Sequence, residues 1–164
     1  MSLLVLEGTT TLDFTFDDVL KYHGPGYPGG VAHGYTAMRV ALPNLAPAVN
    51  RREVKVRTGF RGPGGRDAVE MVLRAVTEGQ YTVTAELEKP ERGVMLERYV
   101  WEFAYRGDVV TVQLRDDGFV VEEFIVLSRK PNRTDDEEAH LAQLKLEMTD
   151  RLLRRDPQEV YEVV

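Results

Sequence analysis

The hydrophobic pattern of the chain changes its period along the sequence. In some segments apolar residues recur every three or four positions, which predicts helices with one buried face. We expect these helices over residues 16–22, 30–42, 66–77 and 134–155. Other segments alternate apolar and polar residues, which predicts half-buried strands. We expect these strands over residues 53–60, 81–87, 94–105, 109–114 and 119–127.

The connections after residue 81 are short and carry turn residues: Arg92-Gly93, Gly107-Asp108 and Asp116-Asp-Gly118. Strands joined in this way are expected to pair as an antiparallel meander. Together the segments predict an α+β fold, with an antiparallel sheet packed with helices, as a single domain over residues 1–164. Residues 1–13 begin apolar and become rich in threonine, which fits either a short strand or a loose arm.

Composition and charge exclude several classes of function. The net charge of −6 argues against a general nucleic-acid or anionic-membrane binder. No apolar run approaches the roughly 20 residues needed to span a bilayer, and the first residues lack the basic region of a signal peptide. The absence of cysteine excludes disulfides and thiolate chemistry, and a cytoplasmic location is the simplest expectation.

The stretch 22–34 is the main candidate for chemistry. It holds His23 and His33 and the glycines at positions 24, 26, 29, 30 and 34. Glycine lets the backbone approach a ligand closely, and the start of the following helix offers free N–H groups to an anion. We expect a pocket for a small ligand or a metal here. The alternative is a tight turn between helices, with His33 as a partly buried side chain.

Other candidate motifs give weaker signals. Residues 59–65 form a second glycine-rich loop before a helix, but no Gly-Lys-Ser/Thr follows, which favours a turn over a phosphate site. The two serines, Ser2 and Ser128, have no neighbouring histidine motif, so no nucleophile and base can be paired. Aromatic residues at 99, 101, 103 and 105 share one strand face, and we interpret them as a packed sheet face rather than a base-stacking platform.

The motifs, taken in order, resemble those of the FmdE/FwdE-like family of formylmethanofuran dehydrogenase components. That family opens with His-Gly-His-x-Cys-Pro-Gly between two helices, where this chain has His23-Gly-Pro-Gly-Tyr-Pro-Gly29. The resemblance continues through Gly34-Tyr35, Asp67-Ala-Val69, the aromatic hairpin 99–112 and the tail 152–163. It spans nearly the whole chain. It implies a stand-alone domain without the zinc ribbon of some members, a fold like the glyceraldehyde-3-phosphate dehydrogenase domain, a homodimer, and a metal at the His-Gly-His-x-Cys loop.

The chain departs from the family at the metal ligands. The second loop histidine is replaced by Pro25 and the loop cysteine by Tyr27, so His23 alone is carried over as a metal ligand. A zinc or iron site needs three or four protein ligands, so we interpret the family's site as degenerate and favour loss of the metal.

Our leading hypothesis is therefore an FmdE-like domain of unassigned reaction that binds a small ligand where the two glycine loops converge. The expected ligand-binding residues are His23, Gly24, Tyr27, Gly29, Gly30, His33 and Asp67. The first alternative is a metal-dependent enzyme with an altered ligand set around His23. The second is a structural or protein-interaction domain in which the loops only turn the chain.

Overall fold

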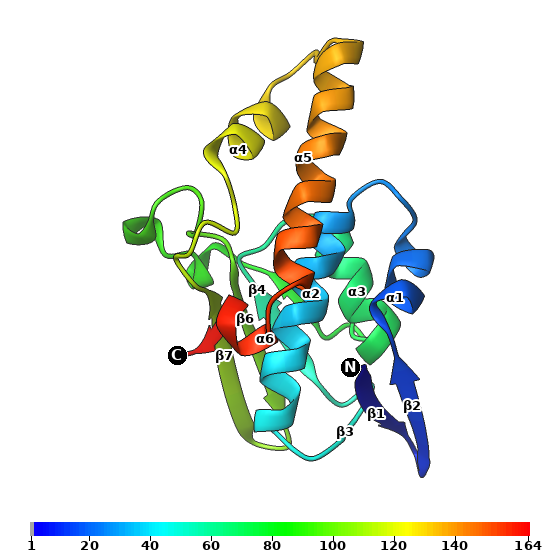
Figure 1. The fold of residues 1–164 in the computed structure, drawn as a ribbon. Helices are drawn as coiled ribbons and strands as arrows, with labels where there is room; N and C mark the ends of the chain where they lie inside the picture. The colour runs from blue at the N-terminus through cyan, green and yellow to red at the C-terminus, as the bar shows by residue number, and fades with distance from the viewer. Residues whose placement is uncertain (1) are drawn as a thin grey trace.

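The computed structural model describes residues 2–164 and contains helices packed against two sheets, which confirms the predicted α+β class (Figure 1). The α-helices are α1 (Phe16–His23), α2 (Pro28–Ala41), α3 (Pro63–Leu73), α4 (Glu122–Arg129), α5 (Asp135–Leu153) and α6 (Pro157–Val160). The 3₁₀ helices are η1 (Leu42–Asn44), η2 (Ala85–Leu87) and η3 (Pro90–Arg92). The strands are β1 (Leu3–Glu7), β2 (Thr10–Phe14), β3 (Val49–Asn50), β4 (Lys55–Thr58), β5 (Tyr81–Val83), β6 (Val100–Tyr105), β7 (Asp108–Leu114) and β8 (Tyr161–Val163).

The larger sheet has five strands in the order β5-β4-β6-β7-β8. Its centre is the antiparallel pair β6 and β7, which the turn at Arg106-Gly107 joins. Trp101, Phe103 and Tyr105 alternate with less buried residues along β6 and face the core. The aromatic face of this strand is therefore a packed sheet face, as predicted.

Part of the predicted meander is wrong. Strand β5 pairs in parallel with β4 instead of following on to β6, and most of residues 94–99 form turns. Residues 119–127 do not form a strand, because helix α4 begins at Glu122. A short apolar run does not distinguish a strand from a helix by its period, and the acids Glu122 and Glu123 suit a helix N-terminus. The sheet edge beside β7 is instead filled by β8.

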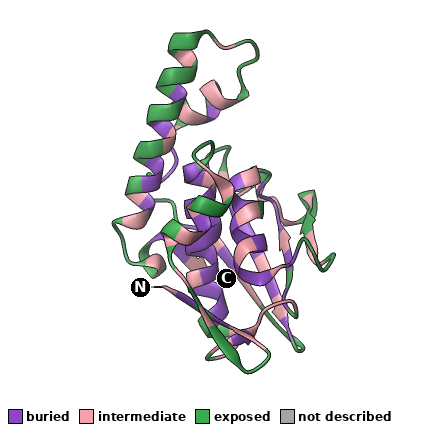
Figure 2. Ribbon diagram, turned by 90° about the vertical axis from the view of Figure 1, so that its right-hand side faces the viewer, coloured by how far each residue is buried: buried purple, intermediate pink, exposed green. Residues whose placement is uncertain are grey.

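Helix α2 is the centre of the molecule. Twelve of its 14 residues are buried, because α3, α5 and the sheet strands β7 and β8 surround it (Figure 2). A helix that is enclosed in this way is apolar on nearly all sides, and only Gly30 and Arg39 are partly accessible. The single buried face predicted from the sequence therefore underestimates how deeply this helix lies in the core.

Two helix starts follow the sequence prediction closely. Thr15 and Asp18 form a capping box at α1, and Thr134 and Glu137 form another at α5. In each box the threonine hydroxyl accepts a backbone N–H, and the acid accepts the N–H of the threonine. These caps fix where the two helices begin.

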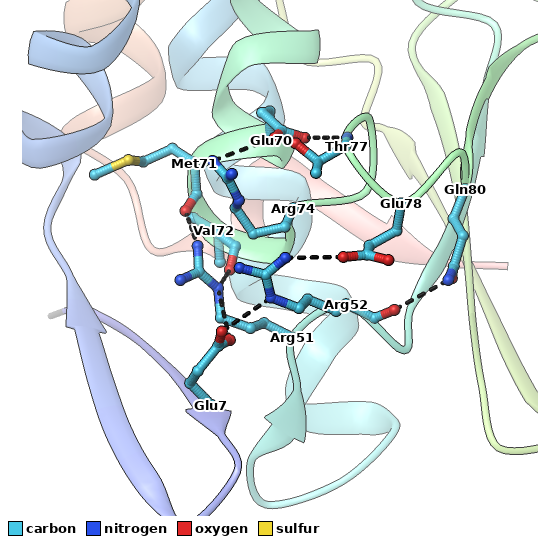
Figure 3. Close-up of polar contacts among 10 residues, drawn as sticks. All are labelled: Glu7, Arg51, Arg52, Glu70, Met71, Val72, Arg74, Thr77, Glu78 and Gln80. Atoms are coloured by element: carbon cyan, nitrogen blue, oxygen red, sulfur yellow. Dashed lines mark hydrogen bonds and ion pairs between the residues drawn. The ribbon is translucent and has the colours of Figure 1, made fainter.

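The N-terminal hairpin β1–β2 and strand β3 form a small sheet. Two arginines that follow β3, Arg51 and Arg52, connect this sheet to α3 by hydrogen bonds and ion pairs (Figure 3). The Arg51 guanidinium donates to the carbonyls of Met71 and Val72, two of the last acceptors of α3. Arg52 pairs with Glu7 of β1 at 2.9 Å. Charge-assisted bonds of this kind satisfy helix-terminal carbonyls that have no partner within the helix.

Helices α4 and α5 form an antiparallel hairpin whose far end projects from the body of the protein (Figures 1 and 2). Along α5, exposed residues dominate near its start, whereas Met148, Thr149 and Leu152 near its end are buried. None of the helices in the described part of the chain has both the length and the apolar character to cross a membrane.

Candidate functional site

The two glycine-rich stretches meet where helices α2 and α3 cross. A Cβ at Gly64 would lie 2.6 Å from the carbonyl oxygen of Tyr27, and one at Gly30 would lie 3.3 Å from the Cα of Gly64. At Gly34 it would lie 3.0 Å from the Cβ of Ala68. The glycines therefore permit a backbone contact that no larger residue allows. This packing brings the N-termini of both helices to one side of the molecule.

A cavity of about 320 Å³ opens at these helix N-termini. One wall comes from the body and the other from the α4–α5 hairpin. Its apolar lining consists of Phe60, Pro63, Val94, Tyr99, Phe124, Ile125, Leu141 and Met148. Its polar lining consists of Tyr27, Gly29, Gly30, Arg61, Gly62, Arg98, Ser128, Arg129, Arg133 and Lys145. Five of these side chains are cationic, and the lining contains no carboxylate.

Three of the cavity arginines are balanced by two acids that lie outside the lining. Arg61 pairs with Glu88 at 2.7 Å, and the Nε of Arg98 lies 3.4 Å from the same carboxylate. Arg129 lies 3.8 Å from Glu97. The last two distances exceed those of a strong charge-assisted hydrogen bond, so these guanidiniums keep donor capacity for a ligand.

The remaining two cations are Arg133, in the connection between α4 and α5, and Lys145, within α5. Arg133 pairs with Glu138 at 2.9 Å and also donates to carbonyls at the end of α4. Lys145 lies on α5, where its Nζ donates to the carbonyl of Gly26 at 3.2 Å and lies 4.2 Å from the ring centroid of Tyr27. Burial lowers the pKa of Lys145, and the Arg133 charge lowers it further.

His23 and Asp67 are brought together beside this cavity but do not line it. The Nδ1 of His23 lies 2.7 Å from Asp67 Oδ2, and the ring packs 5.8 Å from that of Tyr27. The His23 side chain is 7% exposed, and its Nε2 is buried without a hydrogen-bond partner in residues 2–164. Gly24 ends α1 with a φ of 91°, so its role in the structure is that of a C-cap.

His33 lies in the core with a different set of partners. Its Nδ1 is 2.8 Å from the Tyr161 hydroxyl, and its Nε2 is 3.4 Å from the Met148 sulfur. An imidazole protonated at Nε2 satisfies both contacts while staying neutral. Burial lowers the pKa of His33 to about 3. The ring centroids of His33 and Tyr99 are 4.6 Å apart. His33 therefore lies behind the part of the cavity wall that Met148 and Tyr99 form.

Of the expected ligand-binding residues, Tyr27, Gly29 and Gly30 line the cavity, whereas His23, Gly24, His33 and Asp67 do not. The cations of the hairpin were not predicted from the sequence. A role for Arg129 in the cavity was not predicted, because the apolar run before it was interpreted as a strand, whereas it is helix α4. Lys145 comes four residues after Leu141 and so borders the apolar stripe of its helix, a position that could have indicated a role in the cavity wall.

The residues present do not fit the metal that the family resemblance implies. His23 has one carboxylate partner in residues 2–164, Asp67. Across the same residues, no group of three or more His, Cys, Asp or Glu side chains is arranged to hold a metal ion. A zinc or iron site needs more ligands than this pair supplies.

Comparison of the sequence with models of known families finds no match, and comparison with curated proteins finds none either.

Proposed function

We propose that this protein binds a small organic anion in the cavity between the α2 and α3 N-termini and the α4–α5 hairpin. The observation that carries the proposal is a lining with five cationic side chains and no carboxylate, in a protein whose net charge is −6. Clustered charge of one sign in a concave, partly apolar site attracts ligands of the opposite sign. The apolar wall around Phe60, Tyr99 and Phe124 favours an organic ligand over an inorganic ion.

Calorimetric titration with 4-methylpentanoate, a branched carboxylate, tests this function. We expect binding that weakens with added salt, because the attraction is electrostatic. Arg129→Gln removes one cavity cation and is expected to weaken binding about 10- to 100-fold, as a charge-assisted hydrogen bond contributes roughly 1.5–3 kcal/mol. Arg154→Gln is the matched control, since Arg154 pairs with Asp150 and does not line the cavity. Equal losses in the two variants, or no binding in the unaltered protein, would refute the proposal.

A relationship to the FmdE/FwdE-like family is also part of this proposal, together with the cytoplasmic location. The ordered motifs support the relationship, and the first glycine loop, where the family binds its metal, contributes Tyr27, Gly29 and Gly30 to the cavity lining. The homodimer that the resemblance implies is supported by Val126 and Leu146, which are apolar and more than half exposed on α4 and α5. Light scattering tests the dimer. We expect twice the mass of one chain for the unaltered protein and a lower mass for Leu146→Glu.

A further inference from the structure

We propose that Lys145 is a nucleophile that forms an imine with the carbonyl carbon of an oxo acid held in the cavity. This inference rests on the proposed function, because the cavity must first bind the carboxylate of that acid. It adds a covalent reaction and a chemical class: a small oxo acid with an apolar chain.

The position of Lys145 in the cavity wall distinguishes it from the other lysines. Its Nζ is held over the Tyr27 ring and by the Gly26 carbonyl, in the wall of the cavity. Throughout residues 2–164, no carboxylate lies within 4.0 Å of this Nζ, which is also true of Lys21, Lys55 and Lys89 but not of Lys130, which pairs with Glu137. An ammonium without a carboxylate partner loses its proton more readily than a paired one.

The environment also lowers the pKa of Lys145, which makes the neutral amine, the form that attacks a carbonyl, easier to reach. Partial burial disfavours the ammonium, and the positive charge of Arg133 disfavours it further. The one acid that opposes this effect is Glu138, which is itself paired with Arg133. A lysine that is desolvated and placed beside another cation is a recognised form of activated amine nucleophile.

The rest of the lining provides what an oxo acid needs. The carboxylate is expected at the arginines of the cavity, of which Arg98 and Arg129 have the loosest pairing with acids. The apolar chain is expected against Phe124, Ile125 and Leu141. Because Lys145 lines the same cavity, we expect a carbonyl next to the carboxylate to come within reach of the amine, and such proximity converts a bimolecular reaction into one within the complex.

The reaction is balanced without an oxidant or a reductant. The Nζ lone pair forms a bond to the carbonyl carbon, and the carbonyl π pair moves to oxygen, which takes up a proton. The C–O bond then breaks and the oxygen leaves as water with a second proton. The sum converts the ammonium and the ketone into a protonated imine and one water molecule, and the total charge is unchanged.

Reductive trapping tests this inference directly. The protein is incubated with 4-methyl-2-oxopentanoate and cyanoborohydride, which delivers hydride to an imine carbon, and the modified lysines are identified by peptide mass spectrometry. We expect an adduct on Lys145 with the mass of the oxo acid less one oxygen. We expect it to form at least about tenfold faster than on the exposed Lys21, because the bound carboxylate holds the carbonyl beside the Lys145 amine.

Lys145→Arg removes the primary amine but keeps the positive charge, and the adduct at this position is expected to be lost. Calorimetric titration of the unaltered protein with 4-methylpentanoate, which has no keto group to form an imine, measures the anion site separately. Carboxylate binding without a faster adduct on Lys145 would overturn the imine and leave the anion site standing. Adducts that form equally on Lys21 would also overturn it. Absence of binding by either acid would overturn both proposals.

Discussion

The buried His33 makes the stability of this protein depend on pH in a predictable direction. Its ring is fully buried between Tyr161, Met148 and Tyr99, none of which carries charge near neutral pH. Burial disfavours the imidazolium and lowers the pKa to about 3, from 6.5 in the unfolded chain. Between these two values the unfolded chain binds the extra proton. The free energy of unfolding therefore falls as the pH falls from 6.5 toward 3, and this contribution is constant above that range.

The size of the effect follows from the two pKa values. The loss is about 1.4 kcal/mol for each pH unit within the range. Between about pH 8 and about pH 5 it amounts to roughly 2 kcal/mol for this one histidine. At pH 5 the result depends on the unfolded-state value alone, because the folded-state pKa lies well below that pH.

Urea unfolding of the unaltered protein and of His33→Gln at the two pH values measures this contribution. We expect the stability difference between the two proteins to shrink by about 2 kcal/mol from pH 8 to pH 5, because the variant has no group to protonate. Tyr161→Phe is the control: it leaves the imidazole buried but removes a hydrogen bond, so it costs about 1–3 kcal/mol at both pH values. A difference between the unaltered protein and His33→Gln that does not change with pH would refute the reasoning.

Two further predictions concern packing and helix termini, and both are checked by chemical denaturation. Gly64→Ala places a Cβ against the backbone of Tyr27 and is expected to cost about 1–3 kcal/mol, whereas Gly26→Ala, with nothing within 4 Å of its Cβ, is expected to change stability by less than about 0.5 kcal/mol. Arg51→Met leaves the last carbonyls of α3 without their donors and is expected to cost about 1–3 kcal/mol. Arg154→Met removes only an exposed ion pair and is expected to cost less than about 1 kcal/mol. Equal costs within either pair would contradict the structural explanation.

The parts of the fold that could be predicted from the sequence are those fixed by local chemistry. The helix starts near residues 16 and 134 and the aromatic alternation along β6 carry their signal within a few residues. The helix at Glu122 could not be recognised, because its short apolar run fits either period. The parallel pairing of β5 with β4 also has no local signal, since it depends on how α3 crosses between them.

The candidate site shows the same division. The glycines at positions 29, 30 and 64 indicate a close approach of backbone, and the structure shows that all three serve helix packing, whereas only Gly29 and Gly30 also line the cavity. The cavity cations are spread along the chain from Arg61 to Lys145, and each of them alone is typical of a surface charge. Only the folded chain reveals that they share one concave lining from which acids are missing.

The place of β8 in the core has a consequence for how the protein is made. The partner of His33 is Tyr161, which is 128 residues later in the chain, and the helix α5 that covers α2 also comes late. A ribosome adds about 5–20 residues per second. For several seconds, therefore, α2 has been synthesised while α5 and β8, which cover its apolar surface, have not. During that interval the nascent chain depends on chaperones or on partial collapse for protection. The completed core, and with it the back wall of the cavity, forms only after residue 161 has left the exit tunnel.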